Sequence, residues 1–439
     1  RTKMTDASGE KQYTRDAAGR LTKVEQGPTG FTPGSTQNYI IDYTWNAASQ
    51  LEEMELTVRT QSAKLWAYAY TGDGYLDTVT NPDSEVTNHD YLTDGRLKKI
   101  TLRSTAGSNK ATREFFYQDT DASHAYVANK NKHLRKTLDK KQAGAVICSS
   151  EYDLDPTGLR LGREDEAGKY DAWAYDPTYQ LRSESRWSAK TPGSLVYRRQ
   201  FAYDGNGNAV EQFQGGTRYL GIYRDNNDQW FWGAEVMNSD FMGNLASVED
   251  NFLDEFTYDS ERHLILAERA EESDDDTHEY DGDGRRMRSK LNEAANWTHF
   301  IHDEITGNVI GEYTLVSSTF TIKALNTWGI GLISTNREGT KRYYHFAGLG
   351  NTMALTEDDE DVVDTYSYTA FGDSVASTGS SVNPYRYGGQ WGYYDDGAMG
   401  SVFGLLLLGV RYYKPAYGRF LTWDPVPSTN LYTYANNSP

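Results

Sequence analysis

Three features are scarce in this sequence: cysteine, long apolar runs and positive charge. Cys148 is the single cysteine of the 439 residues, which excludes an internal disulfide framework. The longest purely aliphatic run, Leu405 to Leu408, is far shorter than the roughly 20 apolar residues of a membrane helix, so we expect no membrane span. The chain starts at Arg1 without an initiator methionine or an apolar leader, and we expect a piece of a longer protein whose targeting signal lies elsewhere.

The shortage of positive charge limits the kinds of partner. Lysine and arginine number 44 against 63 aspartate and glutamate residues, which gives a formal net charge of −19. Nucleic acids and anionic membranes are bound through basic patches, and these totals do not suggest one. We therefore predict no nucleic-acid partner and an acidic exterior whose main effect is solubility.

Aromatic residues and glycine are abundant. The chain has 33 Tyr, 10 Trp, 15 Phe and 40 Gly, a composition typical of a protein built from strands and turns. Long helices would need more Ala, Leu, Lys and Glu in periodic blocks. The predicted fold class is all-β.

A short pattern recurs along the chain: an aromatic residue, Tyr and Asp at a strand end, then a glycine-containing turn and a second strand. Successive tyrosines of the pattern are about 20 to 30 residues apart, the range expected of stacked supersecondary units. The clearest copies are at 151–161, 201–208, 256–259 and 279–285. Drifted copies begin at Tyr13, Tyr43, Tyr70, Tyr91, Tyr175 and Tyr366.

Each copy of the pattern predicts one β-hairpin. Asp or Asn followed by Gly accepts the positive φ of a tight turn, and the flanking aromatic and β-branched residues favour extended pairing. Because an isolated hairpin is marginal in water, the units must stack into a continuous sheet, whose tyrosine rings form ladders with hydrated or hydrogen-bonded hydroxyls. Stability then accumulates along the stack.

Some segments interrupt the rhythm. Between Thr217 and Glu255 the repeat lapses, and we interpret this segment as an irregular unit or an insertion. The acidic runs 271–276 and 357–361 lie between strand-like segments, where solvated loops are expected.

The C-terminal segment carries a more specific pattern. It contains NPYRYGGQ at 383–390, then 409–425, and NLYTYANNSP at 430–439. These segments strongly resemble the Rhs-repeat-associated core, and the upstream copies resemble the YD repeats of the same family. The core positions that carry the resemblance include Arg411, Tyr412, Tyr413, Gly418, Phe420, Pro425, Asn430 and Tyr432.

The resemblance implies a hollow shell, or cocoon, wound from a spiralling sheet of β-hairpins, similar to the shells of polymorphic Rhs toxins and the C subunits of ABC toxin complexes. It divides the chain into a shell of residues 1–380 and a core of residues 381–439 that acts as a C-terminal plug. The implied partners are the protein's own C-terminal cargo domain, commonly a toxin, an N-terminal region or subunit that completes the shell, and a secretion apparatus. The implied location is secreted or at the surface of a bacterium.

Many cores of this family also resemble an aspartyl autoprotease that releases the cargo. Such chemistry needs two carboxyl groups that share a proton, one as general base on a water and the other as general acid. Asp424 occupies the first matching Asp-Pro position, and Arg419 matches an arginine that could orient a carboxylate or form a structural salt bridge. The family's second aspartate would follow Pro439, and the segment 424–430 is shorter than usual, so the sequence leaves the enzymatic activity open.

No other motif indicates a metal, a cofactor or a second enzyme. The segments beginning at Asp204 and Asp281 resemble parts of a calcium loop but lack the remaining EF-hand ligands, and turn chemistry explains them. The eight histidines show no zinc-binding spacing, and several stand where the repeat has Tyr, as His302 does. Cys148 has no activating partner in the sequence. We predict neither cofactor nor metal.

Two other functions remain open at this stage. A cell-surface adhesion or carbohydrate-binding repeat protein would present exposed tryptophans, for which Trp230 and Trp232 are candidates. A β-propeller or β-helix glycan hydrolase would need paired acids facing a cleft, and a propeller would need repeats of roughly 40 to 50 residues. We favour the cargo-enclosing shell because the core motif is the most specific signal.

Overall fold

The computed structural model describes the whole chain except residues 7–8, 33–37, 60, 104–108, 129, 192, 225–226, 228, 250–251, 271–273, 293 and 318, and the side chains of Asn109 and Trp230. The described part is built from strands, turns and four short 3-10 helices. None of its helices has the length and apolar character that crossing a bilayer requires. The all-β prediction is confirmed.

One large sheet contains 33 of the described strands. Its first part consists of β1 (Lys3–Asp6), β2 (Gly9–Arg15), β3 (Leu21–Gly27), β4 (Tyr39–Trp45), β5 (Leu51–Val58), β6 (Lys64–Tyr70), β7 (Leu76–Thr80), β8 (Val86–Tyr91), β9 (Leu97–Arg103), β10 (Asn109–Tyr117), β11 (Leu134–Lys141), β12 (Val146–Leu154), β13 (Arg160–Asp165), β14 (Tyr170–Tyr175), β15 (Leu181–Trp187), β16 (Leu195–Tyr203) and β17 (Ala209–Gln214).

The second part of the sheet follows without a change of topology. It consists of β18 (Thr217–Tyr223), β19 (Gln229–Trp232), β20 (Glu235–Ser239), β21 (Leu245–Glu249), β22 (Leu253–Tyr258), β23 (Leu264–Arg269), β24 (Asp276–Tyr280), β25 (Arg286–Lys290), β26 (Thr298–His302), β27 (Val309–Val316), β28 (Thr319–Gly329), β29 (Gly331–Arg337), β30 (Thr340–Phe346), β31 (Thr352–Thr356), β32 (Val362–Tyr368) and β33 (Ser374–Thr378).

A small second sheet and the helices lie near the C-terminus. They are η1 (Gly389–Trp391), β34 (Tyr394–Asp395), η2 (Gly397–Met399), β35 (Leu406–Leu408), β36 (Arg411–Lys414), η3 (Pro415–Tyr417), β37 (Arg419–Phe420) and η4 (Ala435–Asn437). The four strands pair antiparallel in chain order.

Each strand of the large sheet pairs antiparallel with the next strand in the chain, as expected of stacked hairpins. The turn after β2 shows how a hairpin closes. Gly19 has a φ of 84°, and the Asp16 carboxylate accepts hydrogen bonds from the amides of Ala18 and Arg20 at 2.9 Å each. The register shifts by one residue beside this turn, which is the bulge expected where glycine takes the left-handed position.

The repeated tyrosine joins each hairpin to the one before it. Its hydroxyl donates a hydrogen bond to the carbonyl that begins the second strand of the preceding hairpin, for example from Tyr70 to Leu51 at 2.9 Å and from Tyr280 to Leu264 at 2.7 Å. The same bond recurs at Tyr91, Tyr117, Tyr203 and Tyr258. The predicted tyrosine ladder is therefore an inter-hairpin hydrogen-bond ladder, with the hydroxyls bonded to the backbone.

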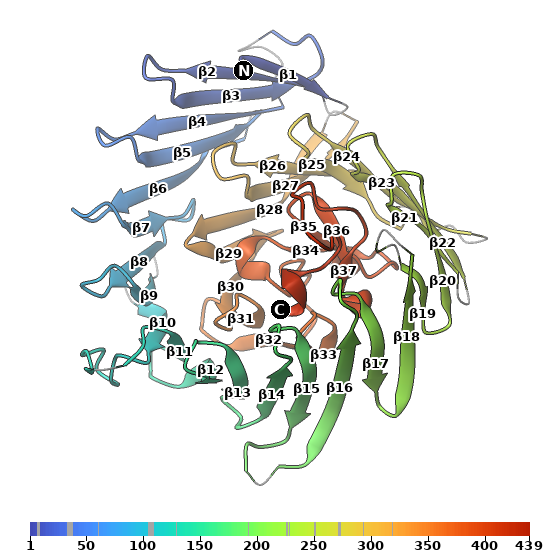
Figure 1. Ribbon diagram of the computed structural model, residues 1–439. Helices are drawn as coiled ribbons and strands as arrows, with labels where there is room; N and C mark the ends of the chain where they lie inside the picture. Colours follow the sequence, from blue (N-terminus) through green and yellow to red (C-terminus); the bar gives the residue numbers. More distant parts are fainter. Residues whose placement is uncertain are drawn as a thin grey trace.

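The sheet spirals inward (Figure 1). Strands β1–β24 make a first winding, and β25–β33 begin a second winding inside it. Hydrogen bonds join the two windings along their length, from the Tyr43 hydroxyl to Asp303 at 3.0 Å and from Arg113 to the Phe346 carbonyl at 2.6 Å. In this part of the molecule the inner face of the first winding is thus covered by later strands of the same chain.

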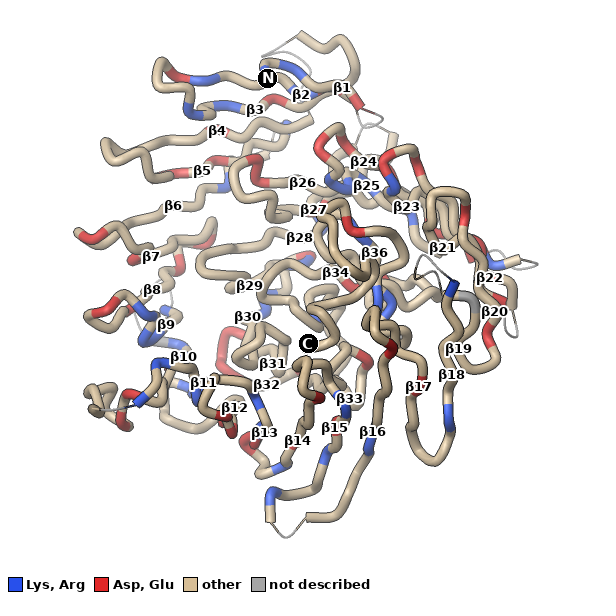
Figure 2. Tube along the Cα trace, in the orientation of Figure 1, with Lys and Arg blue, Asp and Glu red and all other residues tan. Residues whose placement is uncertain are grey.

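Apolar side chains fill the space between the windings. The main buried cluster joins residues of β4–β6, such as Ile41 and Trp66, to residues of β26–β31, such as Phe300 and Leu355. Figure 2 shows that acidic residues occupy many of the hairpin turns, where they cap backbone amides or face solvent. The space between the windings is filled mainly by aromatic and aliphatic side chains, with some paired charged side chains among them.

The structure shows the course of most of the three segments that interrupt the repeat. The segment 217–255 continues the sheet as β18–β21 and the beginning of β22. The expectation of a solvated loop at 271–276 is wrong at its end, because Asp276 begins β24 and is buried, and residues 271–273 lie outside the described part. The run 357–361 forms the turn between β31 and β32.

Candidate functional site

The residues that follow the large sheet lie against the turns at one end of its hairpins. We call residues 381–439 the core segment, and we call the turns at 204–208, 240–244, 259–263, 281–285, 303–308, 347–351 and 369–373 the turn rim. Each of these turns follows the first strand of a hairpin, and each is closed by backbone hydrogen bonds. In Figure 1 the core segment occupies the middle of the spiral.

Side chains of the core segment are hydrogen-bonded to the rim. The Tyr432 hydroxyl donates to the Gly243 carbonyl at 2.6 Å, and the Tyr413 hydroxyl donates to the Phe371 carbonyl at 2.7 Å. Further bonds run from Asn430 to Asn208, from Asn437 to the Gly207 carbonyl, from Trp391 to the Leu349 carbonyl and from Tyr387 to the Ala370 carbonyl. Several motif residues therefore fasten the core segment across the ends of successive hairpins.

Two rim glycines show how closely the core segment approaches. A Cβ atom on Gly243 would lie 2.5 Å from the Trp423 ring, and one on Gly350 would lie 2.3 Å from the Trp391 indole nitrogen. Both glycines also have positive φ, 81° and 93°. Glycine is required here for the turn and for the contact with the core segment.

Asp424 lies at the surface of the core segment and is held by Arg411. The Arg411 guanidinium donates to the Asp424 carboxylate at 2.7 Å, and the Val426 amide donates to the other carboxylate oxygen at 2.9 Å. The Arg411 guanidinium also stacks 3.7 Å above the Phe420 ring. Pro425 follows Asp424 directly and is exposed. This arrangement keeps the Asp424 carboxylate at a defined position with part of its surface open.

Arg419, the arginine singled out in the sequence, has other partners. It is buried, donates to the Asn227 carbonyl at 2.8 Å and stacks on the ring of Tyr432 at 4.4 Å. The contact to Asp424 comes from Arg411, a motif residue for which the sequence suggested no role. Gly418 takes a positive φ of 65° directly before Arg419 and ends η3.

A single carboxylate does not make an aspartyl protease. Among the described residues, the Asp424 side chain is bonded to Arg411 and to the Val426 amide, and no second carboxyl group bonds to it. The Asp424 amide donates to the Leu431 carbonyl at 2.8 Å, which fixes the turn of the core segment that contains Leu431. Proton sharing at this position would need a carboxyl group brought by another segment.

A buried ionic cluster, which sequence reasoning missed, anchors the core segment more deeply. Arg286 of β25 forms an ion pair with Asp396 at 2.7 Å, and the Tyr412 hydroxyl bonds to both side chains at 2.7 Å each. Burial lowers the pKa of the adjacent His278 to about 3, so the ring is neutral beside Arg286. Tyr412 belongs to the core motif, whereas nothing in the sequence marks Asp396 or Arg286 as partners.

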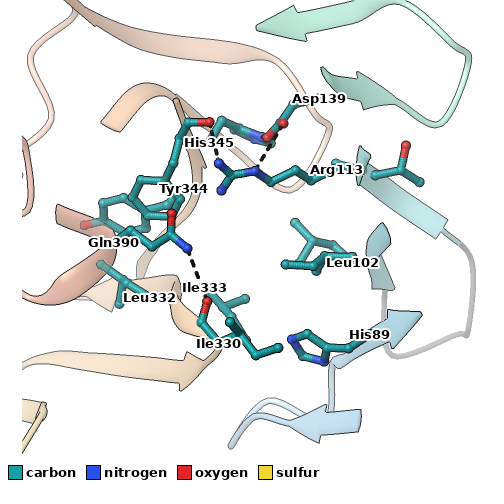
Figure 3. Close-up of a pocket in the computed structure, with 14 residues that line it drawn as sticks. His89, Leu102, Arg113, Asp139, Ile330, Leu332, Ile333, Tyr344, His345 and Gln390 are labelled. Atoms are coloured by element: carbon teal, nitrogen blue, oxygen red, sulfur yellow. Dashed lines mark hydrogen bonds and ion pairs between the residues drawn. The ribbon is translucent and has the colours of Figure 1, made fainter. Parts of the chain in front are cut away.

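A second polar cluster lies in a pocket between the windings (Figure 3). The His345 ring bonds to Asp139 at 2.8 Å and to the Thr356 hydroxyl at 2.9 Å, an order of groups that suits nucleophile activation. All three residues are buried, and the cavity beside them measures about 30 Å³, room for one or two water molecules. The arrangement therefore joins β11 to β30 and β31 and has no room for a substrate.

The remaining sequence candidates have structural partners. Asp281 accepts backbone hydrogen bonds in its turn and forms an ion pair with Lys11 at 3.1 Å. His302 is buried in β26, and burial lowers its pKa. Cys148 is buried, and burial raises its thiol pKa well above the ordinary value. Trp232 is buried rather than exposed, and the side chain of Trp230 lies outside the described part.

Among the described residues, one group of oxygen and nitrogen ligands comes close enough together to hold a metal ion. It consists of Asp259, Glu261 and His263 in one rim turn. The Asp259 carboxylate already caps the turn and bonds to the His263 ring at 2.9 Å. Other rim turns have Asn in place of His263, as at Asn208 and Asn244, so this contact is part of the turn.

Comparison of the sequence with known proteins gives the following relatives. No family model matches the chain. The tRNA3(Ser)-specific nuclease WapA of Bacillus spizizenii is 30% identical over 196 residues, 42% of this chain and 8% of that protein. Double-stranded DNA deaminase toxin A of Burkholderia cenocepacia is 26% identical over 301 residues, 58% of this chain and 20% of that protein. The chain thus spans a small part of the length of these relatives.

Comparison of the fold with solved structures covers nearly the whole chain. The crystal structure of TcdB2-TccC3 matches 98% of this chain and 28% of that chain, with a TM-score of 0.65 and 15% identity. The Photorhabdus luminescens Tc holotoxin pore matches 98% of this chain and 26% of that chain, with a TM-score of 0.64 and 14% identity. The resemblance to Rhs/YD-repeat proteins is thereby confirmed for the fold, a spiralling antiparallel sheet of hairpins.

Proposed function

We propose that this chain, which has the fold of an Rhs/YD-repeat toxin shell, forms the closing end of a shell around a polypeptide cargo and that its core segment takes part in releasing that cargo. The observation that carries the proposal is the position of the core segment. It lies across the turn rim and is hydrogen-bonded to successive turns, from Gly207 to Ala370. A segment so placed closes the end of the spiral.

The names of the relatives support a toxin as the cargo. They are a tRNA nuclease and a DNA deaminase toxin, and the chain matches only 8% and 20% of their lengths. Most of the length of each relative lies outside the matched region, so the nuclease and deaminase activities can belong to other parts of those proteins. This is expected of a shell attached to varied cargo. The proposed location is secreted or at the bacterial surface, and the proposed partners are the cargo, a region or subunit that completes the shell, and a secretion apparatus.

For release, we assign Asp424 the role of one carboxylate of an aspartyl autoprotease. Arg411 holds it at 2.7 Å, and a second carboxyl group would come from a further segment of the full protein. Arg419 is proposed as a positioning residue, because it packs on Tyr432, and the carbonyl of the preceding residue, Leu431, accepts the hydrogen bond of the Asp424 amide. The core segment then holds one carboxylate rigidly while the second arrives with the substrate strand.

Encapsulation is tested on the full-length gene product that contains this chain. We expect any segment following the core to resist a soluble protease while the sheet is folded and to be digested once the sheet is unfolded by denaturant. Mass spectrometry of the fragments over time gives the measurement. Digestion of that segment at the same rate in the folded protein as in isolation would reject the shell function.

Autoproteolysis is tested separately with Asp424→Asn in the same full-length protein. The substitution should reduce self-cleavage at least a hundredfold, because Asn cannot exchange the proton. Asp254→Asn is the matched control, since Asp254 also pairs with an arginine, Arg269 at 2.8 Å, but belongs to β22 of the large sheet rather than to the core segment. If the Asp424→Asn protein is cut at the same bond and rate as wild type, Asp424 has no catalytic role.

A further inference from the structure

One stretch of the junction between the core segment and the turn rim is open. A pocket of about 410 Å³ lies between the rim turns 281–285 and 303–308 on one side and the core residues 391–394 and 407–410 on the other. Its volume falls within the roughly 300 to 1,000 Å³ of small-molecule sites. Asp424 and Arg419 are not among the residues that line it. It is therefore separate from the proposed protease site.

The floor of this pocket is aromatic. It includes the buried side chains of Phe300, Trp328, Tyr385 and Tyr394. The rings of Trp328 and Tyr385 meet edge to face with centroids 5.8 Å apart, and those of Phe300 and Tyr394 do so at 5.5 Å. Rings fixed in this way offer both faces and edges to a further ring in edge-to-face or offset contact.

The polar atoms of the floor are already satisfied. The Trp328 indole donates to the Val309 carbonyl at 2.8 Å, and the Tyr394 hydroxyl donates to Glu312 at 3.3 Å. The His302 ring lies between the carbonyls of Arg286 and Gly307, at 3.0 and 3.1 Å. The charged side chains that also line the pocket, Asp283, Arg285 and Arg286, are each engaged in an ion pair. A saccharide would bury hydroxyl groups against the aromatic rings without partners there, which is unfavourable. The floor accepts an apolar ring.

The mouth of the pocket differs from the floor because it has a polar side chain that can bond to a ligand. The side-chain amide of Asn308 lines it, and within the described part of the chain no hydrogen bond to that amide is formed. Trp391 is 53% exposed at the same opening, with its indole nitrogen bonded to the Leu349 carbonyl at 2.9 Å. The bond fixes the indole while leaving much of its surface available. One polar group of a ligand can therefore reach Asn308 while the ring enters the pocket.

We propose that this pocket binds a small planar aromatic molecule, of one or two fused rings, with a single hydrogen-bonding group directed at Asn308. The volume, the four-ring floor and the satisfied polar atoms carry the proposal. Such a ligand contacts the large sheet through Phe300 of β26 and Trp328 of β28, and the core segment through Tyr385 and Tyr394. Its binding therefore stabilises the junction between the two parts.

Indole is the probe for the test, since it has two fused rings and one N–H group. Saturation-transfer NMR on the folded chain should detect indole, with a dissociation constant in the millimolar range or below. Val410→Trp places a bulky ring at the mouth, and Trp391→Ala removes a wall of the mouth; each should weaken binding at least tenfold. Val426→Trp is the matched control, because Val426 is 67% exposed and does not line the pocket.

The outcomes separate the alternatives. Retained binding in Val426→Trp and weakened binding in the two pocket variants support the proposal, provided that the variants keep the circular dichroism spectrum of the wild type. Absence of indole binding, or equal binding in all variants, would overturn it. Tighter binding of a tryptophan-containing peptide or of N-acetylglucosamine than of indole would also overturn it, by assigning the pocket to a polypeptide or a saccharide.

Discussion

Asp396 is a buried charged side chain of the core segment. It is almost fully buried and pairs with Arg286, which is buried as deeply. Arg286 also lies 4.8 Å from the ring centroids of Phe300 and Tyr394. A buried charge is tolerated only while its partner and hydrogen bonds remain in place. This pair therefore makes the attachment of the core segment sensitive to a single substitution.

Asp396→Asn should destabilise the folded chain by about 3 to 5 kcal/mol, because it leaves the Arg286 charge buried without its counter-charge. Asp395→Asn is the control. Asp395 is 3.9 Å from Arg386, and burial raises its carboxyl pKa, so neutralising it should have a much smaller effect. Chemical denaturation followed by tryptophan fluorescence measures both. Equal destabilisation by the two variants would show that the ion pair between Asp396 and Arg286 contributes no more to stability than the contact of Asp395.

Glu184→Gln should stabilise the chain at pH 8 and have little effect at pH 4. Burial raises the pKa of Glu184 to about 7, above its ordinary 4.5, so the stability that its protonated form contributes is present below 4.5 and lost as the pH rises through 7. A shift of this size corresponds to about 3 kcal/mol at high pH. Gln keeps an oxygen for the Ala370 amide, and Arg199 keeps Asp373 at 2.5 Å. Denaturation midpoints at both pH values test this, and a gain that is equal at pH 4 would contradict it.

The sequence indicates some of these residues and not others. Tyr412, Tyr413, Asn430 and Tyr432 are found through the core motif, and the structure gives each a bond to the rim or to the buried cluster. Asp396 carries no such signal, because its partner is 110 residues away in the chain. The contact of Arg411 with Asp424 depends on the hairpin geometry of β36 and β37, which spacing alone does not define.

Single elements repeat one design, a hairpin with an aspartate-capped turn and a tyrosine that bonds to the previous hairpin. The aspartate orders the turn, glycine supplies the positive φ, and the tyrosine hydroxyl fixes the distance to the neighbour. In the rim turns beneath the core segment, the glycine has the additional task of leaving room for an aromatic side chain, as Gly350 does for Trp391.

Gly350→Ala should therefore cost more than an ordinary glycine substitution in a turn. Gly339 has a similar φ, 85°, but no atom lies within 4 Å of the position of its Cβ, so Gly339→Ala reports the backbone term alone. We expect about 1 to 2 kcal/mol for Gly339→Ala and about 1 to 3 kcal/mol more for Gly350→Ala, because Trp391 must move. Denaturation measures stability, and accelerated proteolysis within 381–439 should accompany the Gly350 variant. Equal losses of stability in the two variants would mean that Trp391 moves aside without a cost in free energy.

The hairpins themselves could be predicted from the sequence. Tyr, Asp and Gly at a short spacing specify strand, turn and strand locally, and the structure places hairpins at the predicted copies, including those that begin at Tyr13 and Tyr43. The continuity of the sheet through 217–255 could not be predicted, because those strands lack the motif. The packing of β4 against the turn at Asp303 could not be predicted from the sequence either, since it depends on the curvature accumulated over the whole first winding.

The molecule as a whole is held by contacts between its two windings and the core segment, and several titratable groups lie at these contacts. His278 of β24 faces Asp396, Arg286 and Tyr412, and burial lowers its pKa to about 3. His299 of β26 stacks on Tyr313, and burial, helped by Arg288, lowers its pKa to about 4. Both rings are neutral at pH 7.

Acid should therefore loosen the assembly of windings. A histidine with a folded pKa below its unfolded value of 6.5 contributes stability that is complete above 6.5 and is lost as the pH falls toward the folded pKa. Each such histidine costs about 1.4 kcal/mol per pH unit in that interval. Protonation of Glu184 and of Asp276, whose pKa burial raises to about 6, acts in the opposite direction and offsets part of the loss.

His278→Gln isolates one of these contributions. Gln does not titrate and can keep a hydrogen bond to the Tyr412 hydroxyl, which lies 3.2 Å from the His278 ring nitrogen. Between pH 6 and pH 4 the stability of the variant should fall less steeply than that of the wild type, by about 1.4 kcal/mol per pH unit, while between pH 7.5 and pH 9 the two curves should run parallel. Denaturation midpoints across the pH range give both slopes. Parallel curves below pH 6 would show that His278 is already protonated in the folded chain, and the buried cluster would then hold two cations against the single charge of Asp396.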